Sequence, residues 1–142
     1  MFESAELGHK VDRELFRAEE ATLRQALLDA QYRLLERSDF QVVVMFCGVP
    51  TAGKGEMVNL LMEWMDPRHI TTHAFGQPND EERCRPPMWR YWRTLPPKGK
   101  IAFLFGGWYA DPPWNYLDTH DELLFRLHID RIAHVEKMLA DE

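Results

Sequence analysis

Residues 41–55, QVVVMFCGVPTAGKG, join a short apolar run to a loop rich in glycine. The apolar run is rich in β-branched residues and ends at a glycine, which predicts a strand buried on both faces. Beyond the loop, apolar residues from Met57 to Trp64 recur at the spacing of one helical face, and Asp66-Pro67 ends that pattern. Strand, loop and helix in this order predict one unit of a parallel α/β sheet.

The loop has the spacing G-x-x-x-x-G-K of a phosphate-binding loop, at the junction of strand and helix where such loops occur. Its glycines allow backbone N–H groups to surround a phosphate, and Lys54 supplies a long, flexible cation. Gly55 stands where many such loops have the Ser or Thr that holds Mg²⁺, which disfavours an ordinary ATPase. The alternative is a structural turn with a surface lysine. The candidate phosphate-binding residues of the loop are Gly48, Thr51, Ala52, Gly53, Lys54 and Gly55.

Further helices are predicted before and after this unit in the sequence. An apolar stripe at helical spacing, with Phe16 and Leu34 among its members, predicts a helix over residues 12–37, and a second stripe predicts one over 118–139. Asn79 is expected to cap a short helix. A further short helix, with Trp89 to Arg93, is expected after Pro86-Pro87.

Two further strands are expected, a weak one over residues 69–75 and a buried one over 101–105. Helices that alternate with buried strands predict the α/β class, with a parallel sheet covered by helices on both faces in three layers. Two or three strands are few for such a sheet. We therefore expect the N-terminal part of a longer domain, truncated at its C-terminus.

Composition restricts the function classes. The chain has 142 residues, enough for one domain, and its net charge of −6 disfavours a general nucleic-acid-binding protein. No apolar run is long enough to span a membrane, and the acidic start lacks the features of a secretion signal, so a cytoplasmic protein is expected. Cys47 and Cys84 are predicted to be free thiols, and the histidines lack metal-ligand spacing, so no metal ligand is identified.

A second cluster of cations lies between residues 83 and 100, where aromatic residues separate them. Guanidinium groups and stacked rings suit phosphate chains and nucleobases. The alternative is that the aromatic residues belong to the core and that the cations are solvated on the opposite face. The cluster comprises Arg83, Arg85, Arg90, Arg93, Lys98 and Lys100, with Trp89, Tyr91 and Trp92 between them.

These motifs together resemble the second family of polyphosphate kinases, which includes the polyphosphate:AMP phosphotransferases. The resemblance covers nearly the whole chain, and a glycine after the loop lysine is normal in that family. It rests on Ala52-Gly53-Lys54-Gly55, Asp66-Pro67-Arg68, Ala74-Phe75-Gly76, Glu81-Glu82, Trp89-Arg90-Tyr91-Trp92-Arg93, Leu95-Pro96-Pro97-Lys98-Gly99 and Trp108-Tyr109.

The resemblance implies a fold like that of thymidylate-kinase-type P-loop proteins and phosphoryl transfer between polyphosphate and AMP or ADP, with Mg²⁺. It implies that Lys54 and Arg90 act in catalysis, and that the backbone from Gly48 to Gly55 holds phosphates. Further cations would offset the charge of polyphosphate. The cations assigned to phosphate or nucleotide binding in this way are Arg68, Arg90, Arg93 and Lys98.

The sequence departs from the family pattern at three points. Pro50 stands where active members usually have an acidic residue, and Phe105-Gly106-Gly107 replaces an acidic-Arg-Ser run. The third departure is length, because the family's domain continues for roughly another hundred residues, an ordinary domain size. The chain resembles the N-terminal copy of fused two-domain members, which is commonly degenerate. Residues 1–40 are expected to pack as a helical segment on the domain that begins at residue 41.

Three functions stay open at this point. The first is a polyphosphate:nucleotide phosphotransferase domain. The second is a non-catalytic domain that forms a homo-oligomer or pairs with an active copy, which the missing carboxylates favour. The third is an unrelated ATP-dependent small-molecule kinase, which would hydrolyse nucleotide without polyphosphate.

Overall fold

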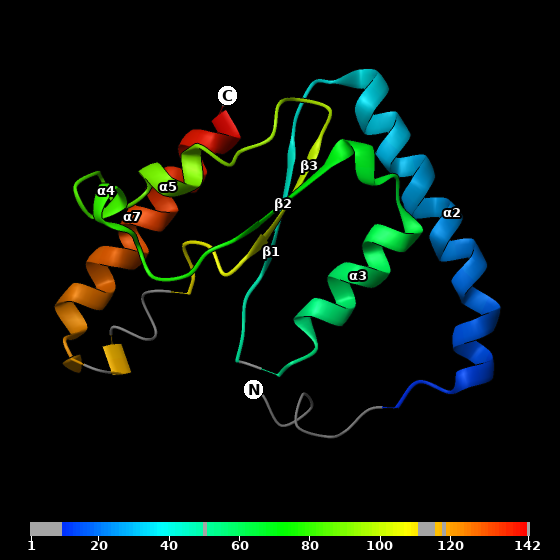
Figure 1. Cartoon of the computed structure of the whole chain (residues 1–142), viewed down its shortest axis with the longest axis horizontal. Coiled ribbons are helices and arrows are strands. Elements are labelled where there is room, and N and C mark those ends of the chain that lie inside the picture. The colour runs from blue at the N-terminus through cyan, green and yellow to red at the C-terminus, as the bar shows by residue number, and fades with distance from the viewer. Residues whose placement is uncertain (1–9, 50, 111–115, 118, 142) are drawn as a thin grey trace.

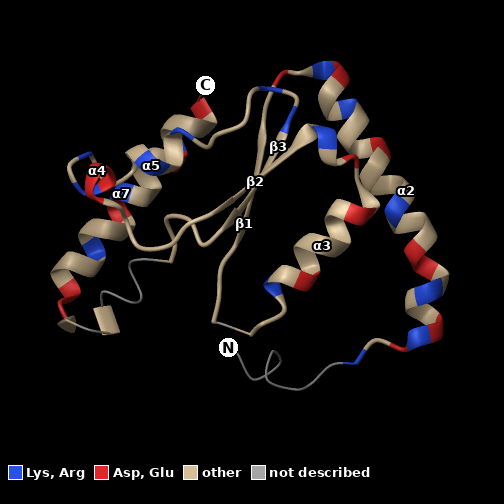
Figure 2. Ribbon diagram, in the orientation of Figure 1, with Lys and Arg blue, Asp and Glu red and all other residues tan. Residues whose placement is uncertain are grey.

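A computed structural model describes residues 10–49, 51–110, 116–117 and 119–141. Three strands form one parallel sheet in the order β1-β3-β2: β1 spans Val42–Phe46, β2 spans Ile70–Ala74 and β3 spans Ile101–Phe105. The strands carry no Lys, Arg, Asp or Glu, and the charges lie on the helices and loops (Figure 2). This is the predicted class of parallel α/β sheet.

Helices cover both faces of the sheet, which confirms the three predicted layers (Figure 1). Two long helices lie on one side, α2 (Arg13–Arg37) and α3 (Lys54–Trp64). A short 3-10 helix, η1 (Pro67–His69), follows α3. On the other side lie α4 (Asp80–Arg83), α5 (Trp89–Trp92) and α7 (Glu122–Asp141).

Local signals set the helix ends. The Asp12 side chain accepts hydrogen bonds from the Glu14 and Leu15 backbone N–H groups, and so caps α2 where the sequence predicted its start. Asn79 caps α4 as expected, with the reciprocal bond from Glu82 that defines a capping box. The last helix begins later than expected, at Glu122, and Asp118 lies outside the described residues.

The core has one cluster on each face of the sheet. On the α2 and α3 side the buried residues are Leu34, Val58, Ile70, Ile101 and Phe103. On the α5 and α7 side they are Tyr91, Ala102, Leu104, Trp108 and Ile132. Successive residues of β3 alternate between the two clusters, because side chains of a strand alternate between faces. Its first four residues are buried on both sides, as its apolar run predicted.

The stripe on α2 packs only in its C-terminal half. Leu34 is buried, whereas Phe16 and Leu23 are 42% and 47% exposed. The helix has 25 residues, and α3, its neighbour on this side, has 11, so the first turns of α2 extend past the covered part (Figure 1). The sequence showed the periodicity of the stripe but not the length of its partner.

Candidate functional site

The register of the sheet decides which loops meet. The last residues of the three strands, Phe46, Phe105 and Ala74, are paired side by side. The loops that follow β1, β3 and β2 therefore leave the sheet at one edge, the carboxyl edge. Ligands of open parallel sheets bind at this edge.

In the loop after β1, the side chain of Lys54 folds back and binds the loop's own backbone. Lys54 Nζ donates hydrogen bonds to the carbonyl oxygens of Gly48, at 2.8 Å, and Val49, at 2.6 Å. Gly53 caps α3 with a φ of +77°, a conformation that favours glycine. An open pocket of about 520 Å³, here called the loop pocket, is lined by Thr51, Gly53, Lys54, Gly55, Glu56 and Phe105. Four of the predicted loop residues thus line one pocket, and Ala52 is exposed beside them.

A second pocket, of about 320 Å³, lies past the end of β2. The Arg90 guanidinium lies over the Phe75 ring, 5.2 Å from its centroid, and that of Arg93 lies 4.7 Å from the centroid of Trp89. Both contacts are in the range of cation–π attraction, so aromatic rings hold both arginines. We call it the arginine pocket; His73, Ala74, Phe75, Glu82, Arg90, Arg93 and Thr94 line it.

Neither interpretation of the cluster of cations and aromatic residues between residues 83 and 100 is confirmed in full. Tyr91 is a core residue, as the structural alternative predicted. Arg90, however, is not solvated on an opposite face, because its side chain is only 9% exposed. Trp92 is 47% exposed. The cluster therefore contributes both to the core and to the arginine pocket.

Between the two pockets, the chain turns sharply after β3. Gly106 and Gly107 have φ values of +88° and +92°, and a Cβ added to Gly107 would lie 2.9 Å from Met45 Sδ. The Cys47 thiol donates to the Gly106 carbonyl at 2.8 Å. Burial raises the pKa of the Cys47 thiol, and the nearby charge of Lys54 opposes that rise. The resemblance implied an acidic-Arg-Ser run where this turn stands; Pro50, a second departure from that pattern, lies outside the described residues.

The turn is attached to α7 through one carboxylate. Trp108 Nε1 and the Tyr109 hydroxyl both donate to Glu136 Oε1, at 3.0 and 2.5 Å. The hydrogen bond to Glu136 raises the pKa of Tyr109 to about 12, with burial and the charge of Glu136 acting in the same direction. The C-terminal helix is therefore tied to the carboxyl edge of the sheet.

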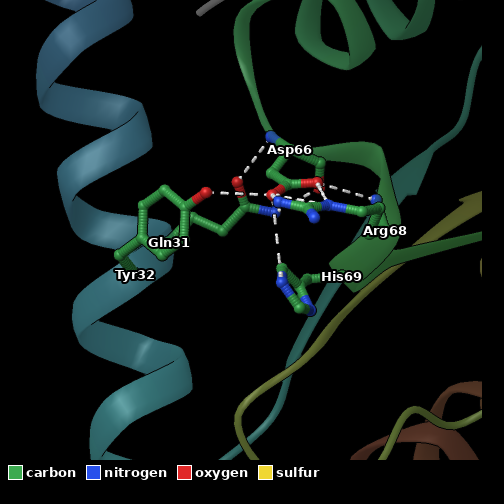
Figure 3. Close-up of polar contacts among 5 residues, drawn as sticks. All are labelled: Gln31, Tyr32, Asp66, Arg68 and His69. Atoms are coloured by element: carbon green, nitrogen blue, oxygen red, sulfur yellow. Dashed lines mark hydrogen bonds and ion pairs between the residues drawn. The ribbon is translucent and has the colours of Figure 1, made fainter.

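Arg68 lies at the opposite, amino edge, because it precedes β2. Its Nε and Nη2 donate to the Asp66 carboxylate at 3.0 and 2.6 Å, and Tyr32 on α2 donates to the same group at 2.9 Å (Figure 3). The hydrogen bond from Arg68 is the main cause that holds the pKa of Asp66 well below its usual range. Gln31 bonds the backbone of Asp66 in both directions (Figure 3). The structure places Arg68 in a link between α2 and the end of α3.

Lys98 also precedes its strand, β3, and lies toward the amino edge. It lines a hollow with Asp39 and Phe40, and the N–H of the next residue, Gly99, donates to the Phe40 carbonyl at 2.8 Å. The structure thus brings Arg90 and Arg93 to the edge that holds Lys54, and places Arg68 and Lys98 away from it. Contacts of these last two with phosphate remain a prediction.

The described part of the chain offers no ready-made metal centre. Within it, no group of three or more His, Cys, Asp or Glu side chains is arranged to hold an ion. Glu56 is the one carboxylate among the lining residues of the loop pocket. The same ranges contain no helix that is both long and apolar enough to cross a bilayer.

Sequence reasoning missed two residues of this edge. Glu136 lies next to Val135 on the buried side of α7, and nothing in its spacing shows that two ring hydrogen-bond donors reach it. The contact of Glu82 with Arg90, 3.6 Å between Oε1 and Nε, was also not foreseen. For Glu82 a signal existed, since Asn79 followed three residues later by Glu is the spacing of a capping box and predicts where that carboxylate lies.

A strand, a glycine–lysine loop and a helix at the edge of a parallel sheet with two helical layers define a P-loop α/β protein of the kinase type. The family model described as Polyphosphate kinase 2 (PPK2) matches residues 10–142. The chain belongs to this family, as the motifs predicted.

Relatives support the same family. The polyphosphate:AMP phosphotransferase of Pseudomonas aeruginosa is 46% identical over 143 aligned residues, which cover 100% of this chain and 29% of that protein. The homologous phosphotransferase of Pseudomonas syringae is 45% identical with the same coverage. This chain therefore spans less than a third of the length of these two curated relatives.

Two solved structures match the fold. A polyphosphate kinase 2 structure from Pseudomonas aeruginosa PA01 has a TM-score of 0.92 at 45% identity, over 99% of this chain and 30% of that one. Polyphosphate kinase 2 from Arthrobacter aurescens TC1 has a TM-score of 0.80 at 22% identity, over 95% of this chain and 50% of that one. At this low identity the second match supports the fold alone.

Proposed function

We propose that the chain is the N-terminal part of a phosphotransferase domain that moves a phosphoryl group between polyphosphate and AMP or a related nucleotide. The observation that carries this proposal is the meeting of two cationic pockets at one edge of the sheet. Lys54 lies in the loop pocket after β1, and Arg90 and Arg93 lie in the arginine pocket after β2. The end of β3 separates the two pockets, because β3 is the central strand.

In this proposal the two pockets have different ligands. Lys54 and the N–H groups at the start of α3 bind the polyphosphate chain, and Arg90 and Arg93 bind the phosphate of the acceptor nucleotide. Such a division brings donor and acceptor to either side of β3, and positioning is the main contribution a protein makes to phosphoryl transfer. Relatives named for transfer between polyphosphate and AMP support the choice of substrates.

The Mg²⁺ that the family implies fits this site as a companion of the phosphates. Mg²⁺ in phosphoryl-transfer sites is held by one or two carboxylates together with substrate oxygens. Glu56 is the carboxylate in the loop pocket that could contribute. The metal would offset the charge of the phosphate chain. The cytoplasmic location of this reaction also remains a prediction from the sequence.

The experiment is a calorimetric titration of the purified chain with polyphosphate and, separately, with AMP, in the presence of Mg²⁺. Lys54→Ala should weaken polyphosphate binding about 10- to 100-fold, the equivalent of one lost charge-assisted hydrogen bond of roughly 1.5–3 kcal/mol. Lys137→Ala, the same substitution at an exposed position of α7 outside both pockets, should leave binding within about twofold. Equal losses in both variants would contradict the proposed location of the site.

Arg90→Ala tests the second pocket in the same titrations. It should weaken AMP binding about 10- to 100-fold and affect polyphosphate much less, since the proposal assigns the two ligands to different pockets. If Arg90→Ala and Lys54→Ala weakened both ligands alike, there would be one shared pocket rather than two.

A specific observation favours a second candidate, a domain that binds phosphate without transferring it. Phe105 ends β3 and lines the loop pocket, and the Gly106-Gly107 turn has no side chain to offer a phosphate or metal. Such a domain would serve a longer protein by forming a homo-oligomer or by pairing with an active copy. An assay for ADP from AMP and polyphosphate, made on the domain extended to the length of its relatives, separates the two candidates, since binding without ADP favours the second. Nucleotide hydrolysis without polyphosphate would instead support an ATP-dependent kinase.

A further inference from the structure

Arg90 is an unusually constrained cation. Its side chain is 9% exposed, and the guanidinium lies beside two rings that contact each other, 5.2 Å from the centroid of Phe75 and 5.6 Å from that of Tyr91. Nη2 donates to the Gly76 carbonyl at 2.9 Å. Nε is buried without a hydrogen-bond partner, and Glu82 Oε1 approaches it at 3.6 Å. The charge of Arg90 is thus balanced by one carboxylate that lies just beyond hydrogen-bond distance.

Glu82 is itself fixed from the other side. Its Oε2 accepts a hydrogen bond from the Asn79 N–H at 2.9 Å, and its own N–H donates to Asn79 Oδ1 at 2.9 Å. The side chain of Glu82 is 20% exposed. One carboxylate therefore joins two elements, since one oxygen binds the start of α4 and the other faces the cation on α5.

We propose that Glu82 is a positioning residue, which holds Arg90 in the orientation that receives the phosphate of the acceptor nucleotide. This inference rests on the proposed function and extends it. Nε and Nη2 form one edge of a guanidinium, and here that edge faces Glu82 and the Gly76 carbonyl. The remaining N–H donors of Arg90 are then available to the arginine pocket. A free arginine side chain has many orientations, and less conformational entropy is lost on binding when the group is already ordered.

A simple electrostatic argument predicts the opposite effect. Glu82 is a negative charge at the edge of an anion pocket, so its removal alone should tighten the binding of a phosphate. Positioning predicts that its removal weakens binding, because the guanidinium then has more orientations to lose. The sign of the change therefore distinguishes the two roles.

The first experiment is a calorimetric AMP titration of the full chain. Glu82→Ala should weaken AMP binding about 10-fold, and the same change in an Arg90→Ala background should produce no further loss, since Glu82 acts through Arg90. Glu82→Gln, which keeps an oxygen acceptor, should recover part of the affinity. Asn79→Ala is the matched control, because it breaks the capping box and leaves the carboxylate beside Arg90.

Three results would overturn the positioning role. They are unchanged or tighter AMP binding by Glu82→Ala, an equal loss in Asn79→Ala, and a full additional loss in the Arg90→Ala background. The second would show that Glu82 acts only through the start of α4. Should Glu82→Ala fail to fold, Glu82→Gln carries the same comparison, with a loss of a few fold expected.

A measurement without ligand keeps this inference separate from the proposed function. The Nε–H resonance of Arg90, assigned by its disappearance in Arg90→Ala, should be a single sharp NMR signal in the wild type and in Asn79→Ala. In Glu82→Ala it should broaden or move to the position of solvated arginines. A sharp signal in Glu82→Ala would refute positioning even if AMP binds. A lost signal, with no AMP binding by the wild type, would refute only the proposed function.

Discussion

Gln31 has the lowest exposure among the buried polar residues of the described part of the chain, at 2%. Its amide donates to the Asp66 carbonyl at 2.8 Å and accepts from the Asp66 N–H at 2.8 Å. Both backbone groups lie just after α3, and the carbonyl also accepts a hydrogen bond from the His69 N–H at 3.3 Å. A single glutamine on α2 thus supplies hydrogen-bond partners to both backbone groups of Asp66, in the turn that leads into β2.

We expect Gln31→Ala to lower the free energy of unfolding by about 1–3 kcal/mol, because the buried Asp66 N–H loses its partner and the Asp66 carbonyl keeps only the hydrogen bond from the His69 N–H, at 3.3 Å. Urea unfolding followed by circular dichroism measures the change. Gln25→Ala on the same helix is the control: its amide donates to Asp29 on an exposed surface, so the loss should stay below about 0.5 kcal/mol. Similar losses in the two variants would contradict the role assigned to Gln31.

Tyr109 predicts a dependence of stability on alkaline pH. Its pKa is raised to about 12 in the folded chain, from an ordinary value of 10.0. A raised pKa means that the contribution to stability is complete below pH 10 and is lost as the pH rises through 12. Urea unfolding between pH 9 and 12 should therefore show a steeper decline for the wild type than for Tyr109→Phe. Parallel curves for the two proteins would contradict the shift.

At the scale of elements, α2 combines a packed half with an exposed half. Leu34 and Leu23 belong to one apolar stripe, but Leu34 is 7% exposed and Leu23 is 47% exposed. Periodicity in the sequence cannot separate them, because it reports the face of a helix and not the extent of the surface opposite. Comparison of the two leucines therefore measures how much of α2 belongs to the core.

We expect Leu34→Ala to cost about 2–4 kcal/mol of unfolding free energy and Leu23→Ala less than about 1 kcal/mol. The two substitutions remove the same atoms from the same helix, so helix propensity cancels between them. Thermal and urea unfolding measure both. A cost for Leu23→Ala close to that for Leu34→Ala would mean that a partner, such as a second copy, covers the first half of α2.

At the scale of the whole molecule, β1 has an open side. Within the described residues it pairs only with β3, and its residues are all half-buried. A hollow of about 240 Å³ lies beside it on the α2 face, lined by apolar residues that include Ala30, Val44 and Leu61. Residues that line an apolar hollow of this size lack packing contacts on one side, and filling it should increase stability.

Ala30→Leu should therefore raise the free energy of unfolding by about 1 kcal/mol, because the added carbons enter the hollow. Ala21→Leu provides the same change on the same helix at an exposed position outside the hollow. Thermal unfolding should separate the variants by a few degrees. If the two leucines have equal effects, the hollow is already filled in solution.

The sequence predicted what local patterns encode. The strand over Val42–Phe46 and the helix up to Trp64 each follow from neighbouring residues, and both were confirmed as elements. The prediction that this strand is buried on both faces was wrong, because all five of its residues are half-buried. Local patterns did not show which arginines lie at the same edge of the sheet as Lys54. Arg68 and Arg90 carry the same charge, and only the direction of β2 places one before the strand at the amino edge and the other after it, near the carboxyl edge.

The hydrogen bonds of Lys54 to its own loop affect both the rate and the affinity of phosphate binding. Lys54 donates to the carbonyls of Gly48 and Val49, so an arriving phosphate enters by exchange with two internal acceptors. The measured dissociation constant is then the intrinsic constant divided by the fraction of molecules in which the lysine has been released. A substitution that weakens the lysine's hold on those carbonyls should tighten binding without touching the ligand, and the association rate should reach a plateau, set by the rate of release, at high phosphate concentration.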